Sequence, residues 1–182
     1  IVTSNETTTL QNFKESLMEE PEYEDILINK EVAEENMDEE TLLVIVDTHK
    51  TNYVEAPELL NKTEKIVVID HHRRSTDYIE NATLTFQEVY ASSAAELVTE
   101  ILQYATTKIN LKTIEAESLY AGIMMDTKNF TFKTGVRTFE AAAYLRKCGV
   151  DIIRVKKWFQ SDLASFNKIA EIVKKAEIVN DS

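Results

Sequence analysis

The chain has 182 residues, of which 43% are hydrophobic and 29% are charged, so it is long enough for one ordinary globular domain with a well-buried core. No apolar run approaches the roughly 18 residues that a membrane-spanning helix needs, and we expect no membrane contact by this segment. Its 3 glycines are too few and too scattered for a Gly-rich nucleotide-binding loop. The single Cys148 excludes an internal disulfide framework and a cysteine-based zinc cluster, and with no signal peptide in view we expect a cytoplasmic location.

The formal net charge of −12 is concentrated at one end of the chain. Residues 1–40 hold 13 acidic and 2 basic side chains, whereas residues 128–157 hold eight basic and two acidic ones. A local excess of positive charge in an acidic protein indicates a focused anion site rather than a surface for DNA. A solvated helix face with ordinary lysines is the alternative interpretation.

In the first half of the chain, the hydrophobic pattern predicts helices followed by strands. Apolar side chains recur at helical spacing over residues 8–20, and Asn29 is a suitable N-cap for a helix that ends at Asn36. Residues 41–47 and 65–70 are short β-branched runs, apolar on both faces, which is typical of central strands in a parallel sheet.

In the second half, a third strand precedes a series of helices. Residues 83–89 alternate between apolar and polar, and Ser93-Ala-Ala-Glu96 is the signature of a capping box that opens a helix. Further helices are predicted over residues 114–125, from a cap at Thr138 to a stop at Gly149, and over residues 163–178. This alternation predicts an α/β domain of three layers, in which helices flank a mainly parallel sheet.

All 3 histidines follow the ends of two predicted strands. Asp47-Thr-His49-Lys closes the first apolar run, and Asp70-His71-His72-Arg-Arg closes the second. Ligands of open α/β sheets bind beyond the carboxyl ends of the strands, and imidazole with carboxylate suits Mn²⁺, Fe²⁺ or Zn²⁺. A single aspartate there is more often a turn-former, but the combination favours a metal site. Adjacent histidines point in different directions, so we expect one of His71 and His72 to bind metal and the other to face substrate.

A third polar cluster ends the helix predicted over residues 114–125. Asp126 is a candidate metal ligand, although with Thr127 it could simply terminate the helix. The residues beyond it that suit a phosphate are Asn129, Lys133, Arg137 and Thr138. Ser92 offers a hydroxyl at another helix start, where capping alone accounts for Ser93.

Four sequence blocks, in this order, resemble the DHH phosphoesterases. They are Asp-Thr-His-Lys from Asp47, Asp-His-His-Arg-Arg from Asp70, Tyr-Ala-Ser-Ser-x-Ala-Glu-Leu-Val-Thr-Glu from Tyr90, and Ala-Gly-Ile-x-x-Asp-Thr-Lys-Asn-Phe-x-x-x-Thr-Gly-x-Arg-Thr-Phe-Glu-Ala-Ala from Ala121. Within that family the likeness is greatest to the cyclic di-AMP phosphodiesterases of the GdpP type. It covers residues 41–178 well, whereas residues 1–40 fit only in pattern.

The resemblance implies a hydrolase in which two Mn²⁺ ions activate a hydroxide that linearises cyclic di-AMP to pApA. It implies that Asp47 bridges both metals and that His71 and Asp126 are ligands of the second metal. His72 corresponds to the histidine that faces the phosphate, and with Asp47 it forms the catalytic pair. The supporting residues would be Asp70 and His49, and the substrate-binding residues His72, Arg73, Ser92, Asn129 and Arg137.

Two parts of the family pattern are not found in this sequence: the first motif, His-x-x-x-Asp-x-Asp, and the C-terminal lobe with its Gly-Gly-His loop. We therefore interpret residues 1–182 as a partial DHH domain. It comprises an acidic helical segment at 1–40, a core with the metal-binding motifs at 41–160, and a helix at 161–182 that leads to a second lobe. On this interpretation we expect one weak Mn²⁺ site, impaired activity and association between copies. The membrane anchor would belong to the full-length parent.

Two other functions stay open at this point. One is an oligoribonuclease or 3′-phosphoadenosine phosphatase of the same superfamily. The other is a non-catalytic regulatory module that keeps the fold without the chemistry.

Overall fold

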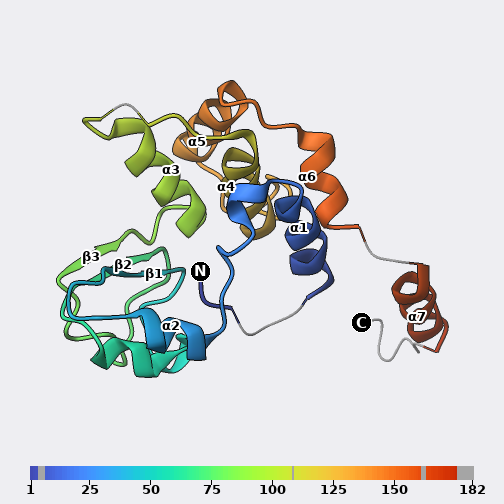
Figure 1. Ribbon diagram of the computed structural model, residues 1–182. Coiled ribbons are helices and arrows are strands. Elements are labelled where there is room, and N and C mark those ends of the chain that lie inside the picture. The colour runs from blue at the N-terminus through green and yellow to red at the C-terminus, as the bar shows by residue number, and fades with distance from the viewer. Residues whose placement is uncertain (4–6, 108, 161–162, 176–182) are drawn as a thin grey trace.

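A computed structural model of the chain describes residues 1–3, 7–107, 109–160 and 163–175. Its sheet has three parallel strands, β1 (Leu43–Val46), β2 (Ile66–Asp70) and β3 (Leu84–Gln87), in the order β1-β2-β3. Because all three run the same way, their carboxyl ends meet at one edge of the sheet (Figure 1). The predicted three-layer α/β class with a parallel sheet is confirmed.

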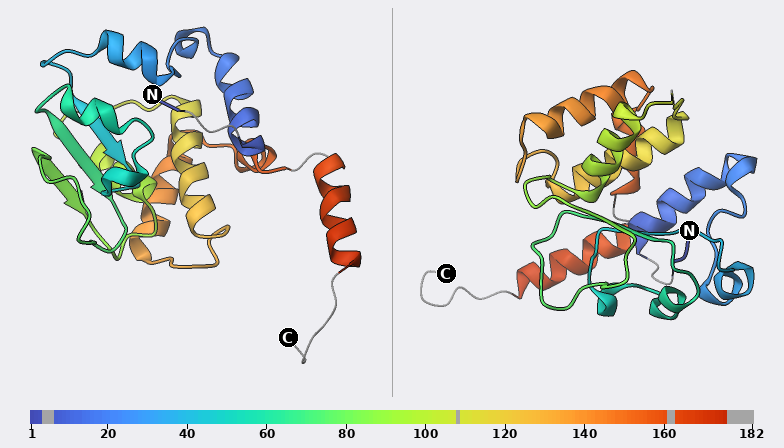
Figure 2. Two further views of the ribbon diagram at one scale, coloured as in Figure 1. Left: turned by 90° about the horizontal axis from the view of Figure 1, so that it is seen from below. Right: turned by 90° about the vertical axis from the view of Figure 1, so that its left-hand side faces the viewer.

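The described part of the chain has seven α-helices (Figures 1 and 2). They are α1 (Thr8–Met18), α2 (Lys30–Asn36), α3 (Ala94–Tyr104), α4 (Thr113–Asp126), α5 (Val136–Lys147), α6 (Ile152–Trp158) and α7 (Leu163–Lys174). Of these helices, α1, α4, α5 and α6 pack together beside the sheet, and α3 packs against β2. Short 3₁₀ helices lie at Pro21–Tyr23, Thr51–Tyr53 and Pro57–Asn61. None of the described helices is both long enough and apolar enough to cross a membrane.

The strand β2 is the centre of the sheet because apolar side chains cover both of its faces. Ile66 and Val68 pack with Leu60 on one face, and Ile69 packs with Leu97 of α3 on the other. A separate core lies among α4, α5 and α6, with α1 packed against it. α3 packs against both β2 and the helices α4 and α5, and so joins the two cores.

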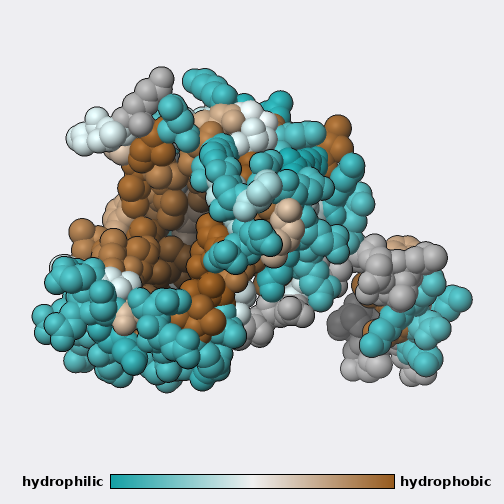
Figure 3. All heavy atoms as spheres, viewed as in Figure 1, coloured by the Kyte–Doolittle hydropathy of each residue, from teal (hydrophilic) through white to brown (hydrophobic). Residues whose placement is uncertain are grey.

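Residues 41–47 were expected to form a central strand, but β1 lies at the edge of the sheet in the described part of the chain. Val44 and Val46 are 48% and 51% exposed. The reason is that Val44 and Val46 lie on the same face of the sheet as Val67 and Ile69, and α3 covers this face only over β2. A groove of about 1180 Å³ runs along β1, and Figure 3 shows apolar surface in the hollow between the sheet and the helices.

The helix boundaries confirm most of the sequence predictions. Asn29 and Ser93 cap α2 and α3 as expected, because their side chains accept the backbone N–H groups of Val32 and Glu96. The first helix ends at Met18 instead of residue 20. The last is described to Lys174, and residues 176–178 of its predicted span lie outside the described residues.

The start of α5 differs from the prediction, and the helix α6 that follows it was not predicted. α5 begins at Val136, so Thr138 is not its cap but sits in its first turn and accepts the backbone N–H of Gly135. Gly149 follows the helix with φ of 103°, a left-handed conformation that favours glycine. The short helix α6 was not predicted, because only tertiary contacts bury its Val155 and Trp158.

Gly122 lets α3 and α4 approach each other closely. A Cβ atom at this position would lie only 2.8 Å from the Cβ of Ala95. The separation of the two helices is therefore set by a residue without a side chain.

Candidate metal centre

The backbone of the sheet brings two aspartates and two histidines to one place. Asp47 follows β1 directly, and its N–H donates to the carbonyl of Ile69, so the end of β1 is fixed beside the end of β2. Asp70 is the last residue of β2, and His71 and His72 follow it. Asp47 has φ of 66°, and such a left-handed non-glycine residue costs free energy, which is typical of functional sites.

The C-terminus of α4 supplies a further carboxylate. His71 Nε2 lies 3.2 Å from Asp47 Oδ1 and 3.5 Å from Asp126 Oδ2. The hydrogen bond with Asp47 raises the pKa of His71 above its ordinary value, against the opposing effect of burial, and the charge of Asp126 adds to the rise. Burial raises the pKa of Asp126, and the charge of Asp47 raises it further, although His71, His72 and Lys133 oppose this. The centre therefore consists of two carboxylates that approach the same imidazole nitrogen.

The donor set fits a divalent cation. Asp47, His71 and His72 each offer a ligand atom, and these atoms all lie within 4.8 Å of one another. Carboxylate and imidazole donors suit Mn²⁺, Fe²⁺ or Zn²⁺. His71 Nδ1 is buried and has no hydrogen-bond partner in the described part of the chain, whereas Nε2 contacts both carboxylates.

The two adjacent histidines do not point apart as expected. Their ring centroids are 4.4 Å apart, with the ring planes tilted by 56°. The sharp turn after β2 explains the difference, because His72 turns back so that its N–H and its Nδ1 both contact Asp70 Oδ1. Either imidazole can therefore reach the same ion.

Asp70 and His49 lie beneath this cluster as a buried pair. Asp70 is fully buried, and its Oδ2 lies 2.5 Å from His49 Nδ1 while its Oδ1 lies 2.7 Å from His72 Nδ1. Burial raises the pKa of Asp70, but the hydrogen bonds from His49 and His72 outweigh it and hold the pKa below its ordinary value. Asp70 is thus a carboxylate that orients histidines.

The loop after α4 has an unusual left-handed turn. Lys128, Asn129 and Phe130 have φ of 47°, 59° and 63°. Thr127, which is fully buried, holds the turn because its hydroxyl accepts the N–H of Phe130 and its carbonyl accepts the N–H groups of Thr131 and Phe132. Thr127 thus caps α4, as the alternative interpretation of this cluster expected, and Asn129 is exposed in the strained turn that follows.

The other predicted substrate-binding residues differ in whether their side chains are already engaged by other residues. Arg73 is exposed and borders the groove together with Asp47 and His72. Ser92 is buried, and its hydroxyl donates to Glu96 Oε2 over 2.5 Å. The guanidinium of Arg137 makes two hydrogen bonds to Glu100, of 2.7 and 2.6 Å. Ser92 and Arg137 are therefore engaged with carboxylates of α3.

Sequence reasoning missed two residues that contact the buried pair. Ser75 lies beside His49, with 3.1 Å between its Oγ and His49 Nε2. Gln87, at the end of β3, donates from Nε2 to the carbonyl of His72 over 2.8 Å. The only signal for Gln87 was its position at a strand end, and Ser75 had none, since it belongs to an irregular loop.

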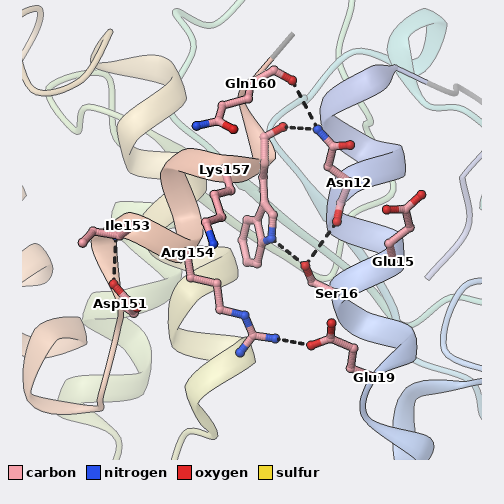
Figure 4. Close-up of a pocket in the computed structure, with 10 residues that line it drawn as sticks. Asn12, Glu15, Ser16, Glu19, Asp151, Ile153, Arg154, Lys157 and Gln160 are labelled. Atoms are coloured by element: carbon pink, nitrogen blue, oxygen red, sulfur yellow. Dashed lines mark hydrogen bonds and ion pairs between the residues drawn. The ribbon is translucent and has the colours of Figure 1, made fainter. Parts of the chain in front are cut away.

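A second concavity lies between α1 and α6 (Figure 4). Its polar groups are paired with one another: Asn12 Nδ2 donates to the carbonyl of Trp158, Trp158 Nε1 donates to Ser16 Oγ, and Arg154 pairs with Glu19. We interpret this region as the junction that holds α1 on the helical core.

The fold and the cluster at the strand ends define an α/β protein with a site suited to a divalent metal. The model of the DHH family, N-terminal domain, matches residues 6–123, and the chain belongs to this family. The match begins within residues 1–40, the segment that the motifs placed in the family only by pattern.

Relatives with assigned activities are similar over most of this chain. The chain is 46% identical over 155 residues to the cyclic-di-AMP phosphodiesterase GdpP of Bacillus subtilis and 44% identical over 155 residues to PdeA of Listeria monocytogenes. Each match covers 85% of this chain but only 24% of the relative. The bifunctional oligoribonuclease and PAP phosphatase NrnA of Mycoplasma genitalium is 32% identical over 122 residues, which is 65% of this chain and 37% of NrnA.

A solved structure has the same fold. The exopolyphosphatase-related protein from Bacteroides fragilis superimposes with a TM-score of 0.77, covering 95% of this chain and 57% of that protein, at 15% identity.

Proposed function

We propose that this chain carries the metal centre of a phosphodiesterase that linearises cyclic di-AMP to pApA. The observation that carries the proposal is the contact of His71 Nε2 with both Asp47 and Asp126, which come from different layers of the fold. The similarity to two cyclic-di-AMP phosphodiesterases supports the choice of substrate. Because the chain spans 24% of these relatives, the activity is proposed for the protein of which it is part.

We propose Mn²⁺ as the cofactor, held by Asp47, His71 and Asp126. A bound divalent ion lowers the pKa of a coordinated water and neutralises charge on a phosphate. We expect one weak site on this chain, because three protein ligands with water in the other positions hold an ion loosely.

The other residues bind and orient the substrate. His72, which is anchored to Asp70, and the exposed Arg73 would face the phosphate from the end of β2. Asn129 and Lys133 would approach it from the loop after α4, where Lys133 already lies near enough to oppose the rise in the pKa of Asp126. Ser92 and Arg137 would bind substrate only after leaving the carboxylates of α3.

We also propose that copies of the chain associate through β1. Its outer edge pairs with no other described strand, and Val44 and Val46 are half exposed on one face of it. An unpaired apolar edge is a template for pairing with another chain.

The test is turnover with Mn²⁺ of cyclic di-AMP, of a linear dinucleotide and of 3′-phosphoadenosine 5′-phosphate, each by the protein of which the chain is part and by its Asp47→Asn variant. Asp25→Asn, an exposed aspartate outside the site, is the matched control. We expect the cyclic substrate to be preferred and only Asp47→Asn to lose turnover. A preference for the linear substrates would instead favour the activity named for NrnA. Turnover that survives in Asp47→Asn would overturn the proposed site.

A further inference from the structure

We propose that Ser75, His49 and Gln87 form a positioning chain that fixes the tautomer and the orientation of His72. This inference deepens the proposed function and rests on it, since it concerns how the same site is prepared for a phosphate. This series of polar contacts runs from the loop after β2, through the buried pair of His49 and Asp70, to the exposed ring of His72.

The direction of the first hydrogen bond decides the tautomer of His49. The backbone N–H of Ser75 points at His49 Nε2 over 3.1 Å. A backbone N–H can only donate, so Nε2 accepts and the proton of the neutral ring is on Nδ1. His49 therefore donates from Nδ1 to Asp70 Oδ2, over the 2.5 Å that separates the two atoms.

Asp70 links His49 to His72, because its two carboxylate oxygens accept hydrogen bonds from both rings. A carboxylate accepts hydrogen bonds with both oxygens, and with Oδ2 engaged by His49 its Oδ1 lies 2.7 Å from His72 Nδ1. The backbone N–H of His72 donates to the same oxygen over 3.2 Å. The proton of His72 is thereby held on Nδ1, and Nε2 is left with a lone pair that can bind an ion or accept a hydrogen bond from a water molecule beside the phosphate, whose own oxygens only accept.

Gln87, on the neighbouring strand β3, holds the backbone of His72. Its Nε2 donates to the carbonyl of His72 over 2.8 Å, whereas its 3.2 Å approach to His49 Nδ1 joins two donors and is not a hydrogen bond in this tautomer. Since β2 and β3 are paired at Asp70 and Gln87, the sheet register itself places this amide. The backbone and the side chain of His72 are thus both held.

The Ser75, His49 and Asp70 trio has the residue types of a serine nucleophile site, but its hydrogen bonds exclude that role. The hydroxyl of Ser75 lies 2.6 Å from the carbonyl of Asp77 and donates to it, so its proton is not directed at His49. The lone pair of His49 Nε2, which would act as the base, is occupied by the backbone N–H of Ser75. The trio is suited to holding a ring still.

The experiment reads the tautomers directly. The chain has 3 histidines, so long-range ¹H–¹⁵N spectra of the imidazoles contain three ring systems, which single substitutions can assign. In the metal-free chain at a pH where the rings are neutral, we expect both His49 and His72 to carry the proton on Nδ1. A proton on Nε2 of His72 in the wild-type chain overturns the inference without the need for any variant.

Variants then test whether the two rings are coupled. His49→Phe removes the donor that fixes Asp70 Oδ2, so the carboxylate is free to rotate away from His72 Nδ1, and we expect His72 to become a mixture of tautomers. His49→Asn restores a donor near the same place and should restore the Nδ1–H form. Ser75→Ala keeps the backbone N–H and should leave both tautomers unchanged. An unaltered His72 in a His49→Phe chain that melts as a folded protein contradicts the coupling.

The kinetic readout separates positioning from simple stability. Loss of a residue that orients a reacting group commonly costs about 10- to 100-fold in metal affinity or activity. We expect His49→Phe to lower kcat to this extent with little change in KM, and His49→Asn to recover most of it. Coupled tautomers, with no Mn²⁺ binding and no turnover of cyclic di-AMP by the protein of which the chain is part, would sink the proposed function alone. Normal turnover with uncoupled tautomers would sink this inference alone.

Discussion

Asp47 and Asp126 approach the same imidazole nitrogen from two different layers of the molecule. His71 Nε2 lies 3.2 Å from the first carboxylate and 3.5 Å from the second. Both aspartates are charged acceptors, so they attract a cation and repel each other. The two carboxylates therefore favour the binding of a metal ion, but their mutual repulsion destabilises the metal-free fold.

Asp126→Asn should therefore stabilise the metal-free chain while weakening its affinity for Mn²⁺. Burial and the charge of Asp47 raise the pKa of Asp126, which means that the ionised form is disfavoured in the folded chain. A neutral amide removes this penalty. Thermal melting without metal should show a higher Tm than the wild type, and calorimetric titration should show a loss of Mn²⁺ binding. A lower Tm without metal would contradict the proposed repulsion.

The stability of the metal-free chain should fall as pH rises through neutrality because of His71. The hydrogen bond with Asp47 raises the pKa of His71 above the usual value of about 6.5. The stabilisation is complete below that unfolded-state value and is lost as pH rises through the higher folded-state value. The Tm difference between the wild type and His71→Gln should shrink over this window. Mn²⁺ needs the neutral ring, so its affinity should show the opposite trend and weaken as pH falls.

Arg137→Ala should raise KM and leave kcat little changed if the guanidinium binds a phosphate uniformly. Arg137 is held by two hydrogen bonds to Glu100, so a substrate must compete for it. A lost charge-assisted bond of about 1.5–3 kcal/mol corresponds to an increase of roughly 10-fold or more in KM. Glu100→Gln should free Arg137 and lower KM. Equal kcat and KM values in both variants would restrict Arg137 to a structural role.

Self-association should depend on β1. Val44→Lys places a charge on the half-exposed face of this strand, and charged side chains protect sheet edges from pairing. Sedimentation velocity should show larger species for the wild type and monomers for Val44→Lys. Leu84→Lys, on the opposite edge strand β3, is the matched control and should still associate. The reverse outcome would assign the contact to β3.

Asn12→Ala should destabilise the chain by about 1–2 kcal/mol, because it removes a side chain that satisfies a carbonyl at the end of α6. Denaturant unfolding measures the change in the free energy of unfolding. Gln11→Ala, on the exposed side of α1, should change it by less than about 0.5 kcal/mol. Equal effects of the two substitutions would mean that the α1 and α6 junction contributes little.

The strand ends could be predicted from sequence because both determinants are local. A β-branched run marks each strand, and the aspartate that follows marks its end, so Asp47 and Asp70 were placed correctly beside each other. The cap at Ser93 was predicted for the same reason, since the cap and the N–H it accepts are three residues apart.

The pairing of polar side chains could not be predicted in this way. Arg137 and Glu100 are 37 residues apart, and a sequence read for phosphate donors counts the arginine as free. The edge position of β1 is also a property of the assembled sheet, since its sequence is as apolar as that of β2. Partners brought together only by tertiary structure leave no periodic signal along the chain.

The close approach of α3 and α4 at Gly122 helps to set the position of Asp126, which we propose as a metal ligand. Asp126 lies four residues further along α4, roughly 6 Å of helix rise from the contact with Ala95. A methyl group at residue 122 would push the helices apart and move the carboxylate away from His71. The geometry of the centre therefore depends in part on a residue that does not contact it. A survey of relatives that scored only the ligands would count a chain with a bulky residue 122 as intact after its site had been lost.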